Sequence, residues 1–205
     1  MIANNDSSAS TPAATKPSVR HWLDLIVGGS AIVIAVISLT VALRQSHIME
    51  RQLAASVWPY LQYDTSNATL EGKPVMSFAV ENVGVGPARV HSVSMRYGDK
   101  PVRDARELWT ACCADLLAGG QKPAWRISTL HDQVLAPNRP KTFLLLTDDP
   151  ANPLFRQRLE SERQKIALRF CYCSVLDQCW MFDSEKDTLA ALPYCPAQQA
   201  DDYRG

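Results

Sequence analysis

Residues Leu25–Leu43, with the sequence LIVGGSAIVIAVISLTVAL, form a continuous apolar run without a charged side chain. As an α-helix rising about 1.5 Å per residue, this run is roughly 28 Å long, which matches the ~30 Å hydrocarbon core of a bilayer. The run is apolar on every face, so one small domain has too little surface to bury it as a core helix. We therefore predict that residues 22–44 form a transmembrane helix whose partner is the lipid bilayer.

A cleaved signal peptide is the main alternative to an anchor. Its apolar core is about 7–15 residues long, and a small-residue cleavage site follows it. Here the run is longer, and the small residues Ala54-Ala55-Ser56 lie well beyond its end, which favours an uncleaved anchor. Gly28 and Gly29 are candidates for a homodimer contact, because small residues let two membrane helices approach closely. Glycine is also frequent in membrane helices generally.

The charges that flank the run do not orient it. Lys16 and Arg20 precede it and Arg44 and Arg51 follow it, so the positive-inside comparison is a tie. All six cysteines follow the run, and an even number within one domain is typical of disulfides formed in an oxidising compartment. We expect a single-pass protein of the cell inner (plasma) membrane whose C-terminal domain is periplasmic or otherwise extracytoplasmic.

The rest of the chain divides by composition into tails, a stalk and one domain. Residues 1–21 are rich in Ser, Ala, Thr and Pro, and residues 196–205 are mostly polar; both are predicted to be disordered tails. Residues 45–57 are predicted to continue the helix as a stalk, which Pro59 ends. Residues 58–195 are long enough for one domain with its own core. The formal net charge is +0, so no nucleic-acid partner is expected.

Short strands separated by turn residues fill most of residues 58–195. The clearest candidates are Val75–Glu81, Ala88–Tyr97, Lys141–Thr147, Lys165–Val175 and Cys179–Phe182. Within the second of these, alternation predicts that Val93 and Met95 face the core and that Val90 faces away from it. Helical periodicity predicts two helices, Asp104–Leu117 and Asn152–Arg163. The predicted fold is mainly β: an N-terminal transmembrane helix followed by a β-sandwich with two inserted helices.

The stretch VMSFAVENVGVGPARVHSVSMRY (residues 75–97) contains a turn motif of four residues: Asn82, Gly84, Gly86 and Pro87. It resembles the first hairpin of bacterial immunoglobulin-like modules, including the cell-adhesion-related type. The segment LAPNRPKTFLLL (residues 135–146) resembles their later turn and strand, although its turn lacks the usual glycine. The whole chain resembles bacterial single-span membrane proteins that carry such a domain. The resemblance implies an immunoglobulin-like β-sandwich and transfers no catalytic residues.

Three of the cysteines are close together in the sequence. Cys171 and Cys173 lie on one predicted strand and face the same side, about 6.6–7 Å apart, which is too far for an easy mutual bridge. Cys179 begins the next strand, so a disulfide between Cys173 and Cys179 is the first expectation. The alternatives are buried free thiols, or a site in which Cys171, Cys173 and Cys179 supply thiolates to zinc or copper(I).

The other three cysteines are Cys112, Cys113 and Cys195. Cys112 and Cys113 lie on the apolar stripe of the first predicted helix. A disulfide between adjacent residues is sterically demanding. We therefore expect one of these two thiols to reach Cys171 or Cys195, so that the helix and the tail are tied to the sheet.

The sequence contains no motif of an enzyme active site. It lacks G-x-S-x-G, H-E-x-x-H and a Walker-type loop, and no cofactor is expected. Trp125, in the loop QKPAWRIS, is a candidate for an exposed contact residue, or else folds back over the core. We predict a non-enzymatic binding or accessory module of the cell envelope that acts on a membrane or envelope protein. The alternative is a thiol-based metal-binding or redox-sensing membrane protein.

Overall fold

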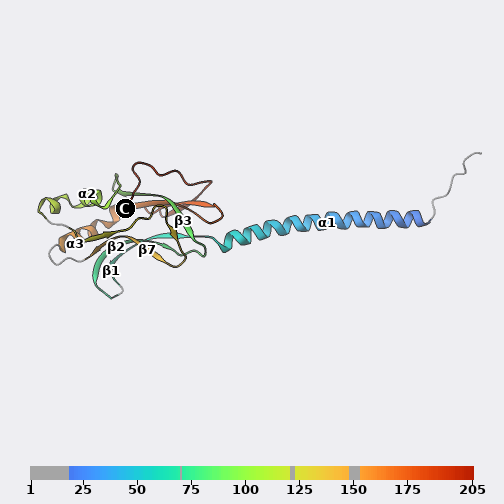
Figure 1. Cartoon of the computed structure of the whole chain (residues 1–205), viewed down its shortest axis with the longest axis horizontal. Helices are drawn as coiled ribbons and strands as arrows, with labels where there is room; N and C mark the ends of the chain where they lie inside the picture. The colour runs from blue at the N-terminus through green and yellow to red at the C-terminus, as the bar shows by residue number, and fades with distance from the viewer. Residues whose placement is uncertain (1–18, 70, 121–122, 148–152) are drawn as a thin grey trace, which may run out of the picture. The chain divides into compact units, whose positions relative to one another are not determined.

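The computed structural model describes residues 19–69, 71–120, 123–147 and 153–205. The predicted tail at residues 1–21 lies almost wholly outside the described residues. Between Arg51 and Gln52 the chain divides into two compact units, of which the second contains both sheets. Figure 1 shows the order of the helices and strands along the chain.

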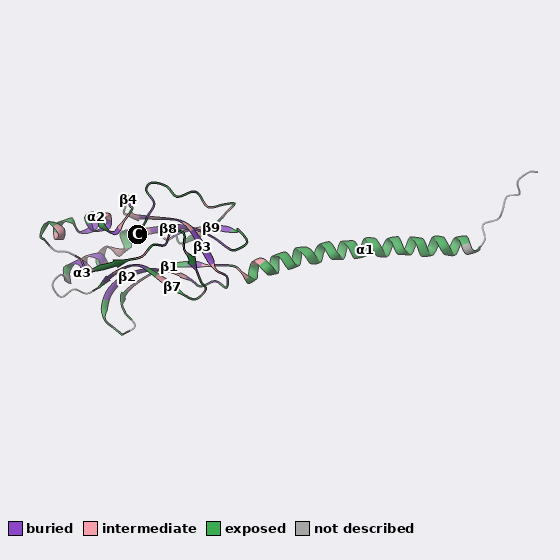
Figure 2. Ribbon diagram, in the orientation of Figure 1, coloured by how far each residue is buried: buried purple, intermediate pink, exposed green. Residues whose placement is uncertain are grey.

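Helix α1 (Val19–Ser56) contains the whole apolar run and continues without a break through the predicted stalk. Among the described residues, it is the one helix long and apolar enough to cross a membrane. Its side chains are exposed along most of its length (Figure 2). The hydroxyls of Ser30 and Thr40 donate to the carbonyls of Val27 and Ile37. These polar groups are therefore satisfied within the helix, as an apolar surrounding requires.

Two antiparallel sheets form the domain that follows α1. The first sheet has the strand order β1-β2-β7-β5, and the second has the order β10-β9-β8-β3-β4, with β6 also paired to β3. The strands of the first sheet are β1 (Leu61–Ala68), β2 (Pro74–Asn82), β7 (Pro140–Thr147) and β5 (Trp125–Ile127). Those of the second are β10 (Thr188–Leu192), β9 (Cys179–Asp183), β8 (Ile166–Cys173), β3 (Ala88–Tyr97), β4 (Lys100–Val102) and β6 (Val134–Leu135).

Two further helices interrupt the order of strands. Helix α2 (Ala105–Ala118) begins where the Asp104 carboxylate accepts a hydrogen bond of 2.9 Å from the N–H of Glu107, a typical N-cap. Helix α3 (Pro153–Glu162) is followed by a short 3-10 helix, η1 (Arg163–Lys165). Trp109 of α2 meets Phe155 of α3 edge-on, with their ring centroids 6.1 Å apart. This aromatic contact joins the two helices inside the core.

The fold is mixed, and the prediction of a mainly β chain is wrong. Of the residues that the structure describes, 36% are helical and 34% are in strands. The difference arises because α1 alone contributes 38 helical residues. The two sheets are antiparallel, and the long apolar helix precedes them, as the sequence indicates.

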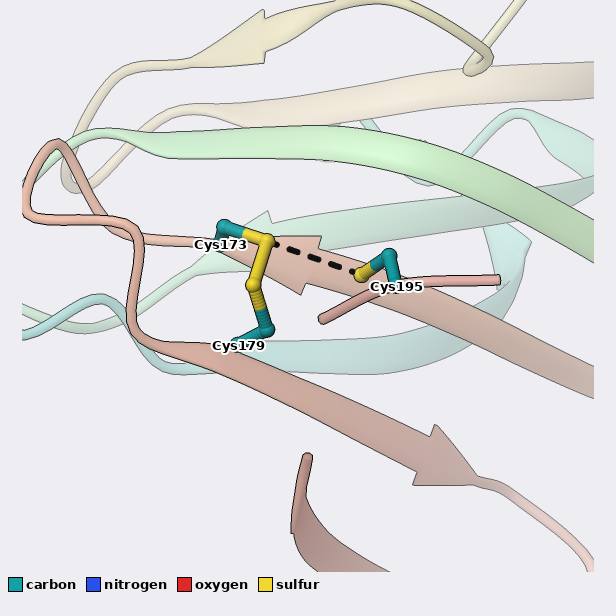
Figure 3. A group of neighbouring side chains, drawn as sticks. All are labelled: Cys173, Cys179 and Cys195. Atoms are coloured by element: carbon teal, nitrogen blue, oxygen red, sulfur yellow. Dashed lines mark hydrogen bonds between the residues drawn. A yellow bond between two sulfur atoms is a disulfide. The ribbon is translucent and has the colours of Figure 1, made fainter. Parts of the chain in front are cut away.

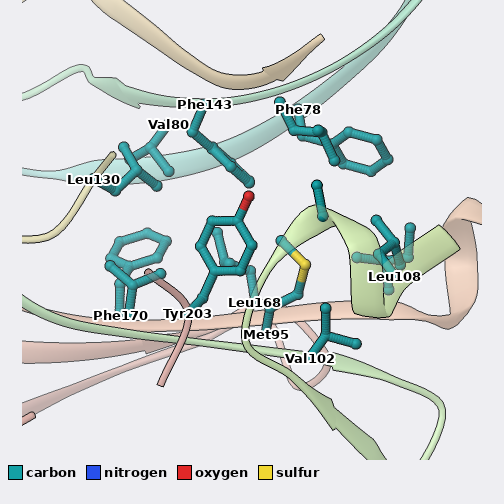
Figure 4. Close-up of a cluster of buried hydrophobic side chains, with 14 of the residues drawn as sticks. Phe78, Val80, Met95, Val102, Leu108, Leu130, Phe143, Leu168, Phe170 and Tyr203 are labelled. Carbon is teal, nitrogen blue, oxygen red and sulfur yellow. The ribbon is translucent and has the colours of Figure 1, made fainter. Parts of the chain in front are cut away.

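One hydrophobic core is built from both sheets and both domain helices (Figure 4). The first sheet contributes Phe78 and Phe143, whose ring centroids are 6.4 Å apart. From the second sheet, Phe170 of β8 stacks on Phe182 of β9, with centroids 4.9 Å apart. Tyr172 adds a polar link between the sheets, because its hydroxyl accepts a hydrogen bond from the N–H of Leu61 at the start of β1.

A β-bulge changes which residues of β3 face the core. The pairing of β3 with β8 shifts in register between Val90 and Ser92. The extra residue resets the alternation, so Val90, only 1% exposed, joins Val93 and Met95 in the core. The prediction that Val90 faces away from the core is therefore wrong.

The final residues of the chain belong to the core, and the prediction of a disordered tail at residues 196–205 is wrong. Tyr203 is 1% exposed, and its ring meets Phe143 edge-on. Its N–H donates to the carbonyl of Val93 over 2.7 Å, and the N–H of Arg204 donates to the carbonyl of Arg103. Val93 lies between the parts of β3 that pair with β6 and with β4. The segment thus enters the core through a gap along the edge of β3, which composition alone does not reveal.

Candidate functional site

Four cysteines gather on β8, β9 and the segment after β10. Figure 3 draws three of them, Cys173, Cys179 and Cys195. Cys171 and Cys173 point to the side of β8 opposite the core residue Tyr172, because successive side chains of a strand alternate. Cys171 forms a disulfide with Cys195, and Cys173 forms one with Cys179. The Sγ atoms of Cys173 and Cys195 are 3.6 Å apart, although no bond joins them.

Two of the expected pairings can be compared with this geometry. The bridge from Cys173 to Cys179 is the one expected first, and it links directly opposite residues of β8 and β9. Cys195 is bonded to Cys171 rather than to a cysteine of the first predicted helix. The disulfide therefore ties the C-terminal segment to β8 and leaves α2 outside the cluster.

Cys112 and Cys113 are bonded to each other, which contradicts the expectation that one of them reaches the sheet. The backbone of α2 makes this possible because Cys113 departs from helical geometry, with φ −141° and ψ 30°. The helix is kinked at this point, and both cysteines are buried. Sequence periodicity treats the helix as regular and so misses the pairing.

The three cysteine sulfur atoms that lie closest together differ from the three predicted as candidate metal ligands. The atoms that lie within 4.8 Å of one another are those of Cys173, Cys179 and Cys195, rather than Cys171 with Cys173 and Cys179. All of them are in disulfides. A thiolate is the form of cysteine that binds metal, so this set offers thiolate ligands only after reduction.

The segment of residues 193–202, called here the C-terminal strap, crosses the second sheet on the side away from the core. It is fixed at one end by Cys195 and at the other by the buried ring of Tyr203. Between them, the buried carboxylate of Asp202 accepts a hydrogen bond of 2.7 Å from the N–H of Gln199. The sequence signal for the strap is a cysteine and a tyrosine that flank a polar stretch.

A pocket of about 310 Å³ lies between the strap and the second sheet. Its polar lining comes from Ser92, Ser94, Arg96, Arg169, Gln199, Asp201 and Asp202. Arg169 is ion-paired with Asp183 at 3.2 Å, and Arg96 with Asp99 at 3.3 Å. The volume is at the lower end of the range of about 300–1,000 Å³ for small-molecule sites.

The predicted turn motif is organised by the side chain of Asn82, which is fully buried. Its Oδ1 accepts hydrogen bonds from the N–H groups of Tyr60 and Gly84, at 3.3 and 3.1 Å. Its Nδ2 donates to the carbonyls of Gly86 and Leu135, at 2.8 and 2.9 Å. One amide therefore joins the loop after β2, the end of β6 and the segment that follows α1.

The glycines of the motif allow this loop to touch the end of α1. A Cβ at Gly86 would lie 1.9 Å from the carbonyl oxygen of Val57, and one at Gly84 would lie 2.3 Å from the backbone nitrogen of Tyr60. Pro87 then leads into β3. We call this contact the neck, defined by residues 57–60 and 82–87.

Apolar side chains are exposed on the loop after β2, on β6 and on the β8–β9 turn, all near the neck. The loop after β2 is bound to the neck, because the N–H of Val85 donates to the carbonyl of Trp58. Arg89 at the start of β3 is paired with β6 on one side and, through its side chain, with Asp177 of the β8–β9 turn on the other. We call the exposed residues the end surface: Val83, Val85, Val134, Val175 and Leu176.

Trp125 is only partly available as a contact residue. It lies in β5 and is 39% exposed. Its ring packs edge-on against the buried ring of Trp109, with centroids 6.1 Å apart. One part of the indole therefore covers the core, and the remainder faces outward.

Burial dominates the titration of three tyrosines of the domain. Burial raises the pKa of Tyr172 to about 12, although the hydrogen bond from the N–H of Leu61 acts in the opposite direction. Burial also raises the pKa of Tyr63 and of Tyr203. These groups therefore stay neutral at physiological pH.

Fold and cysteine pairing define a class of protein: an apolar N-terminal helix of membrane-spanning length, joined to a disulfide-bonded domain of two antiparallel sheets. Residues 22–175 match a family described as a domain of unknown function, DUF8453. The match covers most of the chain, and the chain belongs to this family. It begins in α1 and ends after Cys173, so Cys179 and Cys195 lie beyond it. No curated protein matches the chain.

Proposed function

We propose that this protein is a single-pass membrane protein of the cell envelope whose domain is a non-enzymatic binding or accessory module. In this proposal, residues 22–44 are an uncleaved anchor in the inner membrane and the domain is periplasmic. The length and apolar surface of α1 support the anchor. The pairing of all six cysteines in disulfides supports an oxidising compartment.

We also propose that the two sheets form an immunoglobulin-like β-sandwich. Support comes from the core, in which side chains of both sheets pack together. The consecutive strands β2 and β3 lie in different sheets and are connected by the loop that Asn82 organises. The expectation of a hairpin at residues 75–97 is therefore wrong, because β2 pairs with β1 and β7 whereas β3 pairs with β8, β4 and β6. The proposal of an immunoglobulin-like sandwich rests on the two packed sheets and not on that hairpin.

The end surface is the observation that carries the proposal of a protein partner. Val85 and Val134 are 64% and 66% exposed, and they share this end of the domain with three other exposed apolar side chains. Exposed apolar groups gathered at one place, with polar groups around them, are typical of protein interaction sites. Arg89 and Asp177 supply the polar groups here.

The position of the end surface selects the kind of partner. It adjoins the neck, where Val57 at the end of α1 contacts Gly86. A partner that binds there lies beside Val57, where the domain is joined to α1, and this favours a protein held in the same membrane. Confinement to one membrane raises the effective concentration of both proteins, so a modest contact area is sufficient for binding.

Site-specific photo-crosslinking in intact cells tests this surface. A photoreactive benzoylphenylalanine placed at Val134 is expected to give a discrete adduct with a membrane protein. The matched control is the same probe at Leu154 of α3, which is also an exposed aliphatic residue. The adduct should be lost when Val85→Glu is added. Equal adducts from both positions, or an adduct insensitive to Val85→Glu, would overturn the assignment of the surface.

The topology has a separate test. Intact cells are treated with a membrane-impermeant alkylating reagent, with and without an impermeant reductant, and the mass of the protein is measured. Labelling only after reduction supports a periplasmic domain with disulfides. Labelling that requires lysis but no reduction would place free thiols in the cytosol and refute the proposed topology.

A further inference from the structure

The two disulfides on β8 are close enough to exchange partners. Cys195 is bonded to Cys171, yet its Sγ is also 3.6 Å from the Sγ of Cys173 (Figure 3). Cys173 in turn is bonded to Cys179. A single sulfur, that of Cys195, therefore lies beside two alternative partners on the same strand.

The four cysteines differ in how accessible they are. Cys171, Cys173 and Cys179 are buried, at 6% exposed or less, whereas Cys195 on the C-terminal strap is partly exposed. Access is one of the factors that decide which sulfur of a disulfide an incoming thiolate attacks. Cys195 is thus the point at which a reagent from solution reaches the cluster first.

We propose that Cys171, Cys173, Cys179 and Cys195 form one thiol–disulfide exchange site that accepts electrons from the dithiol of a partner protein and enters reaction at Cys195. This activity goes beyond the proposed binding function and does not depend on it. The partner is defined by its chemistry: a protein that carries two neighbouring thiols.

The reaction balances in two stages. A partner thiolate attacks the Sγ of Cys195, a mixed disulfide forms, and Cys171 leaves as a thiolate. The second partner thiol then closes the partner's own disulfide and releases the Cys195 thiolate. In all, two electrons have passed from the partner to the disulfide of Cys171 and Cys195, and the two partner protons are taken up by the products.

The second stage is internal and needs no further reductant. The Cys195 thiolate attacks the neighbouring Sγ of Cys173, the bond between Cys173 and Cys195 forms, and Cys179 leaves as a thiolate. The two electrons then rest on the thiols of Cys171 and Cys179. The strap is then bonded to Cys173 of β8 in place of Cys171, so it is again attached to the same strand.

The partner attacks the strap at Cys195, but the exchange changes the turn between β8 and β9. The strap is still tied to β8, but the turn of residues 174–178 has lost the disulfide that closes it. That turn carries Val175 and Leu176 and is held on its other side by the pairing of Asp177 with Arg89. Reduction that begins at Cys195 is therefore expected to loosen the β8–β9 turn.

Two single variants of the full chain test the internal step. Cys171→Ser leaves a thiol on Cys195, and exchange moves the free thiol to Cys179. Cys179→Ser leaves a thiol on Cys173, and exchange moves the free thiol to Cys171. Free thiols are trapped in denaturant with a light alkylating reagent, and disulfides are then reduced and labelled with its heavy form. Chymotryptic cleavage at Tyr172 separates Cys171 from Cys173 for mass analysis.

Both variants are expected to contain the new bridge between Cys173 and Cys195, in amounts comparable to the original bridge. Free thiol found solely at Cys195 in the first variant and solely at Cys173 in the second would overturn the proposal. The control background is Cys112→Ala/Cys113→Ala, which removes the disulfide of α2 from the measurement.

Partial reduction of that control background tests the entry point. Dithiothreitol, added at one equivalent per chain, serves as the dithiol probe. The first pair of thiols to appear is expected at Cys171 and Cys179. A first pair that remains at Cys173 and Cys179, or at Cys171 and Cys195, shows that the two disulfides react independently and refutes the exchange site.

Discussion

Replacing Tyr203 by alanine is expected to lower the free energy of unfolding of the domain by about 3–5 kcal/mol, the range for truncating a buried aromatic side chain. The ring is almost completely buried and meets Phe143 edge-on with centroids 5.8 Å apart. The hydrogen bond to Val93 comes from the backbone of Tyr203, so the substitution keeps that donor. The measured loss therefore reports on the ring.

Tyr203→Phe is the matched variant, and its expected effect is opposite. The hydroxyl of Tyr203 is buried and has no hydrogen-bond partner among the described residues. A buried polar group without a partner costs about 1–3 kcal/mol of desolvation. Removing it should leave stability unchanged or raise it by about 1 kcal/mol.

Both variants are made in the full chain, held in detergent micelles, and unfolded with guanidinium while tryptophan fluorescence is followed. A loss below about 1 kcal/mol for Tyr203→Ala would refute the placement of this residue in the core, since surface substitutions have effects of that size. A clear loss of stability for Tyr203→Phe would show that the hydroxyl is bonded.

Three further outcomes follow from the neck and from the buried tyrosines. Gly86→Ala is expected to lower the free energy of unfolding by about 1–3 kcal/mol, because the added methyl group overpacks against Val57. The control is Gly119→Ala, whose new Cβ has its nearest contact at 3.4 Å and should change stability very little in the same guanidinium assay. Equal effects of the two substitutions would contradict the close contact at Gly86. Asn82→Ala leaves the polar groups that it bonds unpaired and should cost about 3 kcal/mol or more; a value near zero, measured in the same way, would remove Asn82 as the organiser of the loop. Because burial raises the folded-state pKa of Tyr172 from 10.0 to about 12, its stabilising contribution is fully present below pH 10 and is lost as the pH rises towards 12. The guanidinium midpoint should therefore fall between pH 9 and pH 12, and a constant midpoint would contradict the assignment.

Features encoded by neighbouring residues were predictable from the sequence. The apolar run, the strands predicted at Val75–Glu81 and Lys141–Thr147, and the expected disulfide between Cys173 and Cys179 all depend on residues a short distance apart. The turn motif was visible as well, because Asn and Gly at its spacing have few other structural roles. Its connection to the segment after α1 was not visible, because the hydrogen bond from Tyr60 to Asn82 joins residues far apart in the chain.

Features that depend on distant contacts or local irregularity were missed. Tyr203 lies among polar residues, and its burial follows from a gap along β3 that no local pattern describes. The bulge at Val90 and the kink at Cys113 each break a regular period by one residue. A periodic interpretation therefore places Val90 on the wrong face of its strand and misses the disulfide between Cys112 and Cys113. The disulfide of Cys171 depended on the fold as a whole, since fifteen pairings of six cysteines are possible.

The late position of Tyr203 has a consequence for how the domain is made. If the domain is exported as proposed, its chain crosses the membrane from the anchor outward, so β1 and β2 arrive long before residue 203. The core cannot close until then, because contacts such as that between Tyr203 and Val93 have a large sequence separation, and such contacts form slowly. Apolar strands and unpaired thiols are meanwhile exposed to the envelope, the condition in which chains aggregate or pair wrongly. The protein is thus expected to depend on envelope chaperones and thiol oxidases during maturation. A pause in export before residue 195 would leave the domain without the disulfide from Cys195 to β8 and without the hydrogen bond from Tyr203 to β3.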